Sequence, residues 1–433
     1  MSTLKVNKIR DTSGSADAIT LDPSGGAVLA GVTTISTARI TTGITTSIQV
    51  GGGVTISESG IEASGIGITC ANINGTQIGG RRNIVINGAM NIAQRNTTST
   101  TSGYTTLDRW NNSYSADASM TFTQHTLTSS DSGPYEEGFR YSNHAANGDT
   151  AAGGTQSLNW QQPIEAQNVS LSGWNYTSPS SFITLSFWAK SSVGQTFNMS
   201  VMTTDGTIKN FPFDVTLAAN TWTKVIKTIP GNSGLQIDND AGEGFRININ
   251  VFTGTTYTSD SVTNDTWQNW ASGSRFRDSD ATWFTTNGAT FEYTGVQLEV
   301  GAQATPFEHR IHQEELHLCK RYYQRYPESP TADNYNCVPS AIMACNNTTT
   351  AYYCPTLNPT MRSSPSFSTS GNFRMNGTSS VNNVAVTAIG VYHNGASTPF
   401  QYASVASGLT AGQAVALSVN NDATAYIAYS AEL

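Results

Sequence analysis

Charged residues are scarce in this sequence, and so are the residues that favour helices. Of the 433 residues, 12% are charged, about half of the ~25% found in typical soluble domains. The chain instead contains 59 threonines and 39 glycines, and threonine, valine, isoleucine and aromatic side chains favour strands. These proportions exclude a helical bundle and a coiled coil, and they argue against an ordinary α/β metabolic enzyme.

Basic residues and long apolar runs are also lacking. The 22 Lys and Arg are outnumbered by 30 Asp and Glu, and the net charge is −8, so we expect no dense basic surface for nucleic acid. No run of about 18 apolar residues occurs, so we expect no membrane-spanning segment. The start of the chain is polar, so we expect no export signal. Without an export signal, an odd number of cysteines indicates reduced, buried thiols and folding in a cytosol. They are Cys70, Cys319, Cys337, Cys345 and Cys354.

Aromatic residues are absent from the beginning of the chain, and their distribution divides it. No Phe, Trp or Tyr precedes Tyr104, and all eight tryptophans lie between Trp110 and Trp283. No lysine follows Tyr326. Regions that differ this much in composition indicate separate domains. We therefore expect an all-β chain with a thin fibrous N-terminal segment (1–82), a jelly-roll β-sandwich (83–310), a short linker helix (311–327) and a small C-terminal β-sandwich domain (328–433).

The segment 1–82 consists of short Ile/Val/Thr runs separated by Gly and Ser, such as residues 31–35, 53–57 and 65–69. It has no aromatic ring, and each ring would bury about 150–250 Å², so the segment alone could hardly offset the entropy of ordering its chain. Its β-branched content is high for a disordered tail. We therefore expect short strands that become ordered by association with identical chains or with a docking partner, and a free flexible linker is the alternative.

Alternation of apolar and polar residues marks the strands of the central block. Residues 245–251 (FRININV) alternate at every position, and residues 183–189 place four apolar side chains on one face. Near the end of the block, the phase of the alternation changes at Gly295, as a β-bulge requires. Strands with one wet face, joined by turns rich in Pro, Gly, Asn and Asp, predict an antiparallel sandwich.

A helical pattern follows the central block at residues 314–323 (EELHLCKRYY), and Pro327 ends it. Leu316, Cys319 and Tyr323 lie on one stripe of this helix. We expect the stripe to pack on a neighbouring sheet or, in an oligomer, on the same helix of another chain. Beyond the helix, the sequence predicts strands of a compact second β-domain at residues 384–389, 414–419 and 425–429.

Short motifs lie at both ends of the central block, in the helix and at the two termini. They are NIVINGAMNIAQR at 83–95 with LDRW at 107–110, GVQLEVG at 295–301 with ATPFE at 304–308, LCKRYY at 318–323, MSTLKVNKIR at 1–10 and YSAEL at 429–433. The first pair resembles the opening strand, and the second pair the closing strand, of a jelly-roll module in bacteriophage tail fibres and related appendage proteins. The helix and the C-terminal residues are also similar to parts of such chains. The first ten residues are similar to the starts of tail-fibre-like proteins of marine phages. The resemblance implies a homotrimeric virion protein with a carbohydrate-binding-module-like jelly roll, and it implies no catalytic residue.

The segment 266–283 combines aromatic rings with polar side chains and lacks a clear strand period. Exposed rings stack on the apolar face of a sugar, while amides, guanidinium groups and carboxylates bind its hydroxyls. The candidate glycan-binding residues are therefore Trp267, Trp270, Arg275, Arg277, Asp278 and Trp283, with core packing as the alternative for each tryptophan. A second candidate is the predicted turn at Tyr392, His393 and Asn394.

Carboxylates cluster at predicted turns, where solvated side chains are the ordinary outcome. Asp238 and Asp240 are also candidate calcium ligands, because Ca²⁺ binds carboxylate oxygens; no other cofactor is expected. A glycan depolymerase would need a pair of carboxyl groups acting as acid and base. The sequence shows no long array of repeated coils of the kind that forms a parallel β-helix, and we expect no enzymatic activity.

These observations predict a non-enzymatic, homotrimeric phage tail-fibre protein that attaches the virion to polysaccharide on the host surface. Its N-terminal segment would bind tail or other virion proteins, and the C-terminal domain would form the distal head. We expect the protein in the virion after assembly in the host cytoplasm, with neither nucleic acid nor membrane as a partner. The alternatives are a purely structural capsid fibre or tail component without receptor contact, and a glycan depolymerase.

Overall fold

The computed structural model describes the backbone of short strands between residues 8 and 77, and residues 81–117, 119–328, 337–377 and 382–433. The chain divides into two compact units, Met1–Cys70 and Ala71–Leu433. Strands in antiparallel sheets are the main regular structure of the described residues, and the helices are few and short, which confirms the all-β prediction. None of the helices in the described part of the chain is long and apolar enough to cross a membrane.

The N-terminal strands pair in small antiparallel sheets. The first sheet contains β1 (Lys8–Arg10), β2 (Asp17–Leu21) and β3 (Ala27–Leu29), the second β4 (Ser47–Val50), β5 (Val54–Ser57) and β6 (Gly60–Ala63), and a hairpin joins β7 (Asn72–Ile73) to β8 (Thr76–Gln77). The run predicted at 53–57 contains β5, whereas the runs at 31–35 and 65–69 lie outside the described residues. Association of this segment with other chains remains a prediction.

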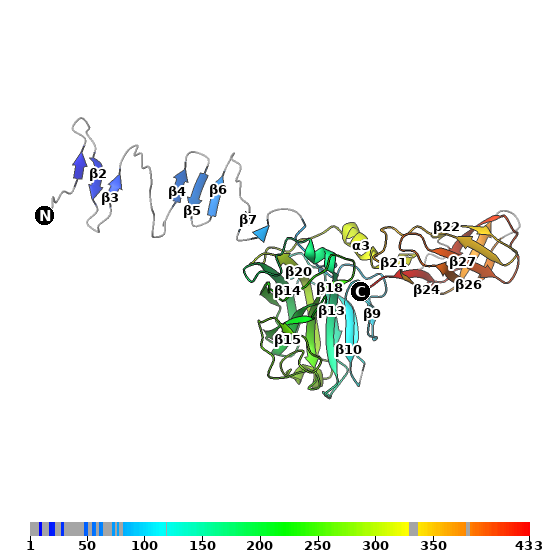
Figure 1. The fold of residues 1–433 in the computed structure, drawn as a ribbon, viewed down its shortest axis with the longest axis horizontal. Coiled ribbons are helices and arrows are strands. Elements are labelled where there is room, and N and C mark those ends of the chain that lie inside the picture. Colours follow the sequence, from blue (N-terminus) through cyan, green and yellow to red (C-terminus); the bar gives the residue numbers. More distant parts are fainter. Residues whose placement is uncertain are drawn as a thin grey trace. The chain divides into compact units, whose positions relative to one another are not determined.

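The central block is a β-sandwich of two six-stranded sheets (Figure 1). Sheet I contains, in spatial order, β17 (Thr223–Pro230), β14 (Phe182–Ser191), β20 (Thr290–Val300), β12 (Tyr141–Ala146), β11 (Thr121–Thr126) and β9 (Thr98–Ser99). Sheet II contains β10 (Asn111–Ser115), β13 (Ser157–Glu165), β18 (Glu243–Thr253), β15 (Gln195–Thr203), β16 (Lys209–Leu217) and β19 (Gln268–Asn269). Two short helices, α1 (Ala166–Ser170) and α2 (Thr282–Thr285), lie in the connections.

The predicted alternation places apolar side chains of both sheets in one shared core. Phe187 and Phe291 of sheet I and Phe197 and Ile247 of sheet II are at most 1% exposed and belong to the same cluster. The predicted bulge is confirmed: the register between β14 and β20 shifts at this point, and Gly295 has φ +65°. The bulge returns the residues after Gly295 to the core face.

The segment predicted as the opening strand of the sandwich does not adopt strand geometry. Residues 81–97 are irregular, yet they run beside β20 and hydrogen-bond to it. Ile84 donates its backbone N–H to the Leu298 carbonyl (2.9 Å), and Gly88 accepts from Val296 (2.9 Å). A regular ladder is interrupted because Asn87, with φ +59° and no exposed surface, turns the chain back on itself.

The predicted helix is α3 (His312–Lys320), and it packs on the irregular opening segment rather than on a sheet. Leu316 and Cys319 are buried against Ile86 and Ile92. Helix α3 ends before Tyr323, because the following residues leave the helix to form β21 (Tyr323–Tyr326). Contact with the same helix of another chain remains a prediction.

The C-terminal domain consists of a three-stranded sheet and a barrel. Sheet III contains β21, β29 (Tyr426–Ser430) and β24 (Ser366–Ser370), in that order. The closed barrel contains β22 (Cys337–Cys345), β23 (Thr350–Tyr353), β27 (Phe400–Val405), β26 (Val384–His393), β25 (Phe373–Gly377) and β28 (Ala414–Val419). We expected a two-sheet sandwich here; the sheet closes because β28 pairs with both β22 and β25.

Candidate functional site

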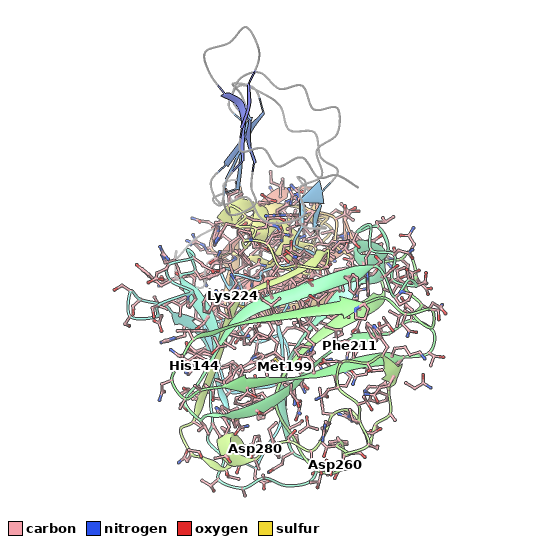
Figure 2. All side chains as sticks on the ribbon, turned by 90° about the vertical axis from the view of Figure 1, so that its left-hand side faces the viewer. His144, Met199, Phe211, Lys224, Asp260 and Asp280 are labelled. Carbon is pink, nitrogen blue, oxygen red and sulfur yellow. The ribbon has the colours of Figure 1, made fainter. Side chains whose placement is uncertain are left out.

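The outer face of sheet II carries mainly amide and hydroxyl side chains. Along β13, Leu158 and Trp160 point into the core, so Asn159 and Gln161 point outward. The same alternation places Asn248 of β18 and Asn210 of β16 on the outer face. Met199 and Phe211, labelled in Figure 2, are core residues of the neighbouring strands β15 and β16.

A pocket of about 100 Å³ is open on this outer face. We call it the sheet pocket. It is lined by Ser157, Asn159, Gln161, Ser200, Met202, Asn210, Arg246, Asn248, Thr253, Trp270, Arg275 and Phe276. Strands β13, β15, β16 and β18 therefore form its floor, and the loop that follows β18 supplies its rim.

The floor of the sheet pocket contains amide oxygens without a hydrogen-bond partner. Asn210 is 2% exposed, and its Nδ2 donates to the Arg275 carbonyl (2.7 Å), but its Oδ1 accepts no hydrogen bond. The Oδ1 of Asn159 is buried and unpaired as well. A buried polar atom without a partner costs about 1–3 kcal/mol, so these two oxygens need a water molecule or a ligand to hydrogen-bond to them.

The rim is held over the sheet by backbone pairing and ring contacts. Strand β19 pairs with Lys209 and Asn210 at the edge of sheet II and brings Trp270 to the pocket. The Arg275 guanidinium lies 4.1 Å from the centre of the Tyr257 ring and 5.6 Å from that of Trp270. The indole of Trp270 is half-buried and borders the pocket, so part of its surface is available for a sugar ring.

Of the residues predicted from the sequence to bind glycan, Trp270 and Arg275 line the sheet pocket. Trp283 does not: it has no exposed surface and packs in the sandwich core. This expectation is corrected, because a ring without exposed surface cannot stack on a ligand. Trp267 packs beside Phe211 (5.4 Å between ring centres) and donates to the Pro230 carbonyl (2.7 Å), which also makes it a packing residue.

The remaining predicted residues lie outside the lining of the sheet pocket. Arg277 and Asp278 are exposed on the loop after β18, where Asp278 accepts a hydrogen bond from Thr258 (2.6 Å). In Figure 2 this loop lies at one end of the sandwich, where Asp260 and Asp280 are labelled.

Asp238 and Asp240 lie in a turn beside Asp205. The Asp205 carboxylate accepts from the Asp238 backbone N–H (2.8 Å), and Asp240 accepts from that of Gly242 (2.8 Å). Burial, together with repulsion by neighbouring carboxylates, raises the pKa of Asp205. Among the described residues no group of three or more His, Cys, Asp or Glu side chains is placed to hold a metal ion, and calcium binding here remains a prediction.

The second predicted tip lies on the barrel and consists of aromatic rings. Tyr392 is 50% exposed, and its ring lies 5.5 Å from that of Phe400 and 4.8 Å from that of Tyr402. His393 stacks on Phe400 at 6.5 Å. These rings form an aromatic cluster that is exposed at Tyr392 and His393.

Three cysteines have described side chains. Cys319 and Cys345 are buried and free, as predicted, whereas Cys354 is free but exposed.

Sequence reasoning missed the amides Asn159, Gln161, Asn210 and Asn248. The alternation that predicts inward apolar residues also predicts which residues point outward. An unusual number of amides at those outward positions is the signal that could have identified the pocket floor.

A scan of the sequence against protein-family models found no match, and a search of curated proteins found none either. Similar solved structures include the enzymatically active domain of tailspike protein 4 of bacteriophage CBA120, with 15% identity and a TM-score of 0.28 over 50% of this chain and 21% of that one. A putative sugar-binding protein from Bacteroides thetaiotaomicron shows 12% identity and a TM-score of 0.28 over 50% of this chain and 99% of that one. A family 11 carbohydrate-binding module of a Clostridium thermocellum cellulase shows 10% identity and a TM-score of 0.25, over 48% of this chain and 96% of that one. This chain thus spans about a fifth of the tailspike chain.

Proposed function

We propose that this protein binds glycans and that the sheet pocket is its binding site. The observation that carries the proposal is the pair of unpaired, buried amide oxygens of Asn159 and Asn210 beside the half-buried indole of Trp270. Sugar hydroxyls donate to amide oxygens, and the apolar face of a pyranose stacks on an indole. One ligand can make both kinds of contact at once.

The chemistry of the pocket favours a neutral sugar. No Asp or Glu is among the described residues that line it. The guanidinium of Arg246 is occupied by both oxygens of Glu243, at 2.6 and 2.7 Å. Nε and Nη2 of Arg275 donate to the backbone carbonyl and the hydroxyl of Ser272, at 3.2 Å each, so this edge of the guanidinium is occupied as well. The pocket is also smaller than the ~300–1,000 Å³ of typical small-molecule sites, so we expect it to hold a single sugar ring of a longer chain.

The same lining supports binding without hydrolysis. Glycoside hydrolysis ordinarily uses two carboxyl groups about 5–9.5 Å apart, and the described lining of the sheet pocket provides none. Depolymerase activity is the alternative. It would be revealed by release of reducing ends from a polysaccharide that the protein binds.

For the biological role, we propose a homotrimeric tail fibre of a bacteriophage that holds the virion to glycans on the host surface. The motifs at residues 83–95, 295–301 and 318–323 support this role by their resemblance to such proteins. The N-terminal segment would dock to the tail, and Asp238 and Asp240 would bind Ca²⁺. A structural virion component without receptor contact is the alternative; labelling of intact particles with an antibody to the chain would place it on the tail or on the capsid.

The binding proposal is tested with the full chain on a glycan array. We expect binding to neutral glycans, and Trp270→Ala should weaken it at least about tenfold through lost stacking. The matched control is Tyr392→Ala, which removes an exposed ring of the barrel cluster and should leave binding unchanged. If Tyr392→Ala abolishes binding while Trp270→Ala does not, the site lies on the barrel. If the wild-type protein binds no glycan, the adhesin role is wrong.

A further inference from the structure

A second and larger hollow lies between the sandwich and sheet III. This junction cleft has a volume of about 710 Å³, within the ~300–1,000 Å³ range of ligand sites. One wall comes from the sandwich segment around β9, which carries Arg95 and Tyr104. The floor is the face of sheet III that carries Arg325, Tyr426 and Ser368. In the strand register Arg325 and Ser368 lie on either side of Ala428, and Tyr426 lies two positions from Ala428 on the same face.

Arg325 is the key residue of the junction cleft. It is 6% exposed, and its Nη1 donates to the carbonyls of Gln94 (3.2 Å) and Arg95 (2.9 Å). Its Nε is buried and has no partner. Its guanidinium carbon lies 4.7 Å from the centre of the Tyr426 ring, so the backbone carbonyls and the ring fix the orientation of the guanidinium plane.

The charge of Arg325 is also uncompensated among the described residues. The neighbouring Arg95 pairs with Glu432 (3.1 Å), and Arg109 pairs with Glu432 as well. No carboxylate of the described chain forms an ion pair with Arg325, and none lines the cleft. A buried guanidinium that keeps a free N–H edge is the donor that a planar carboxylate matches with two hydrogen bonds.

We propose that the junction cleft binds a saccharide that carries a carboxylate, such as a uronic acid. The carboxylate accepts hydrogen bonds from the free edge of Arg325. The half-buried rings of Tyr104 and Tyr426 provide apolar walls, and hydroxyls such as that of Ser368 bind the sugar hydroxyls. This site goes beyond the neutral-sugar pocket on sheet II, and it shares no lining residue with it.

The arrangement favours a carboxylate over other anions. The guanidinium of Arg325, with Nη1 bound to backbone carbonyls, supplies one positive charge and one remaining planar pair of donors, which suits a monoanion better than a phosphate dianion. Nucleic acid would need a row of cations along its backbone, and the described cleft offers only Arg95, already paired, and Arg325.

The proposal is tested by calorimetric titration of the full-length protein with oligogalacturonate and oligoglucuronate. The methyl esters of the same oligosaccharides serve as neutral controls, and free sulfate and phosphate as controls for simple anions. We expect at least one of the two acids to bind at least tenfold more tightly than its ester, with weaker binding at higher salt. Equal binding of acid and ester, binding of simple anions alone, or no binding of either acid would overturn the proposal.

Substitutions in the junction cleft test whether the acidic oligosaccharide binds there. Arg325→Gln should weaken binding of the acid at least tenfold, and Ser368→Trp should block the cleft from an exposed position without removing a structural hydrogen bond. The matched control is Arg140→Gln, because Arg140 also lies over a tyrosine (4.1 Å from Tyr135) and donates to backbone carbonyls but lines no cleft described here. Trp270→Ala should leave binding of the acid unchanged, which separates this site from the sheet pocket. Wild-type affinity in both Arg325→Gln and Ser368→Trp would exclude the junction cleft.

Discussion

The two six-stranded sheets share one core, but the polar groups buried around Glu292 on sheet I and those buried around the sheet pocket on sheet II differ in how they are paired. On sheet I, the buried carboxylate of Glu292 is bound by Lys190 (3.0 Å), His125 (3.1 Å) and Ser142 (2.9 Å). On sheet II, the buried amide oxygens of Asn159 and Asn210 have no partner.

The difference follows from what covers each sheet. The loop after β11 and the segment after β20 lie over sheet I and supply partners: Glu137 accepts from the Trp188 indole (3.0 Å), and Gln297 accepts from the Glu308 backbone (2.8 Å). On sheet II, Arg321 and Tyr322 cover the end of β13 and bind the buried carboxylate of Glu165, but the loop over the sheet pocket leaves an opening. Where other parts of the chain cover polar groups and hydrogen-bond to them, those groups stabilise the fold. Where polar groups border an opening and have no partner, they are suited to bind a ligand.

The largest expected loss of stability comes from removing the buried carboxylate on the outer face of sheet I. Glu292→Ala removes the buried carboxylate that both Lys190 and Ser142 bind, and Lys190 then keeps only Asp131 (3.1 Å). We expect a loss of about 3 kcal/mol in the free energy of unfolding, measured by urea denaturation. Asn159→Ala on the open face is the control. Since its oxygen has no partner to lose, it should cost less than about 1 kcal/mol. Equal losses for the two variants would show that the two faces do not differ.

The bulge that shapes sheet I should be the next most sensitive position. In Gly295→Ala the new Cβ would lie 2.6 Å from Cζ of Phe139, at φ +65°. We expect a loss of about 2–3 kcal/mol in the same assay. Gly173 also has a positive φ (+89°) but has open space around it, so Gly173→Ala should cost about 1 kcal/mol. If both cost the same, the contact with Phe139 has no effect on stability.

Lowering the pH should reduce the stability of the fold through two titratable groups of sheet I, His144 and Glu292. Burial lowers the pKa of His144, so below about pH 6.5 the unfolded chain binds a proton that the folded chain excludes, and stability falls as pH falls. Although burial alone would raise it, the pKa of Glu292 is lowered because Lys190 stabilises its charge; this contribution is complete above about pH 4.5 and is lost as pH falls through the folded value.

The measurement is the melting temperature as a function of pH. His144→Gln should remove the part of the decrease that begins near pH 6.5. An unchanged profile in His144→Gln would contradict the assignment.

The smallest effect is expected at the rim of sheet I. Lys224 and Glu137 form an ion pair at 2.7 Å with both side chains about one-third exposed. Exposed pairs contribute about 0–1 kcal/mol, so Lys224→Ala should change the free energy of unfolding by less than about 1 kcal/mol. A loss as large as that of Glu292→Ala would mean that burial does not determine which ion pairs stabilise this face.

Local alternation was enough to predict the strands and the bulge. The period of two in residues 245–251 and the phase change at Gly295 are properties of short stretches of sequence. Closure of the barrel was not predictable in this way, because it depends on pairing β28 with β22, which is distant in sequence. A strand with one apolar face fits a sandwich and a barrel equally well.

The candidate site was predicted only in part. Aromatic residues serve both cores and binding surfaces, so the sequence could not separate Trp270, which borders the pocket, from Trp283, which is buried. The junction cleft was missed because Arg325 and Tyr426 lie about a hundred positions apart and become neighbours only through the pairing of β21 with β29.

The most direct test of the account is a crystal structure of the full chain soaked with the neutral oligosaccharide that binds best on the array. We predict a sugar ring against the Trp270 indole, with hydroxyls donating to Oδ1 of Asn159 and Asn210. A ligand bound over the closed face of sheet I, or on the aromatic cluster of the barrel with the sheet pocket filled only by water, would contradict the central claim that the open face of sheet II is the glycan-binding surface.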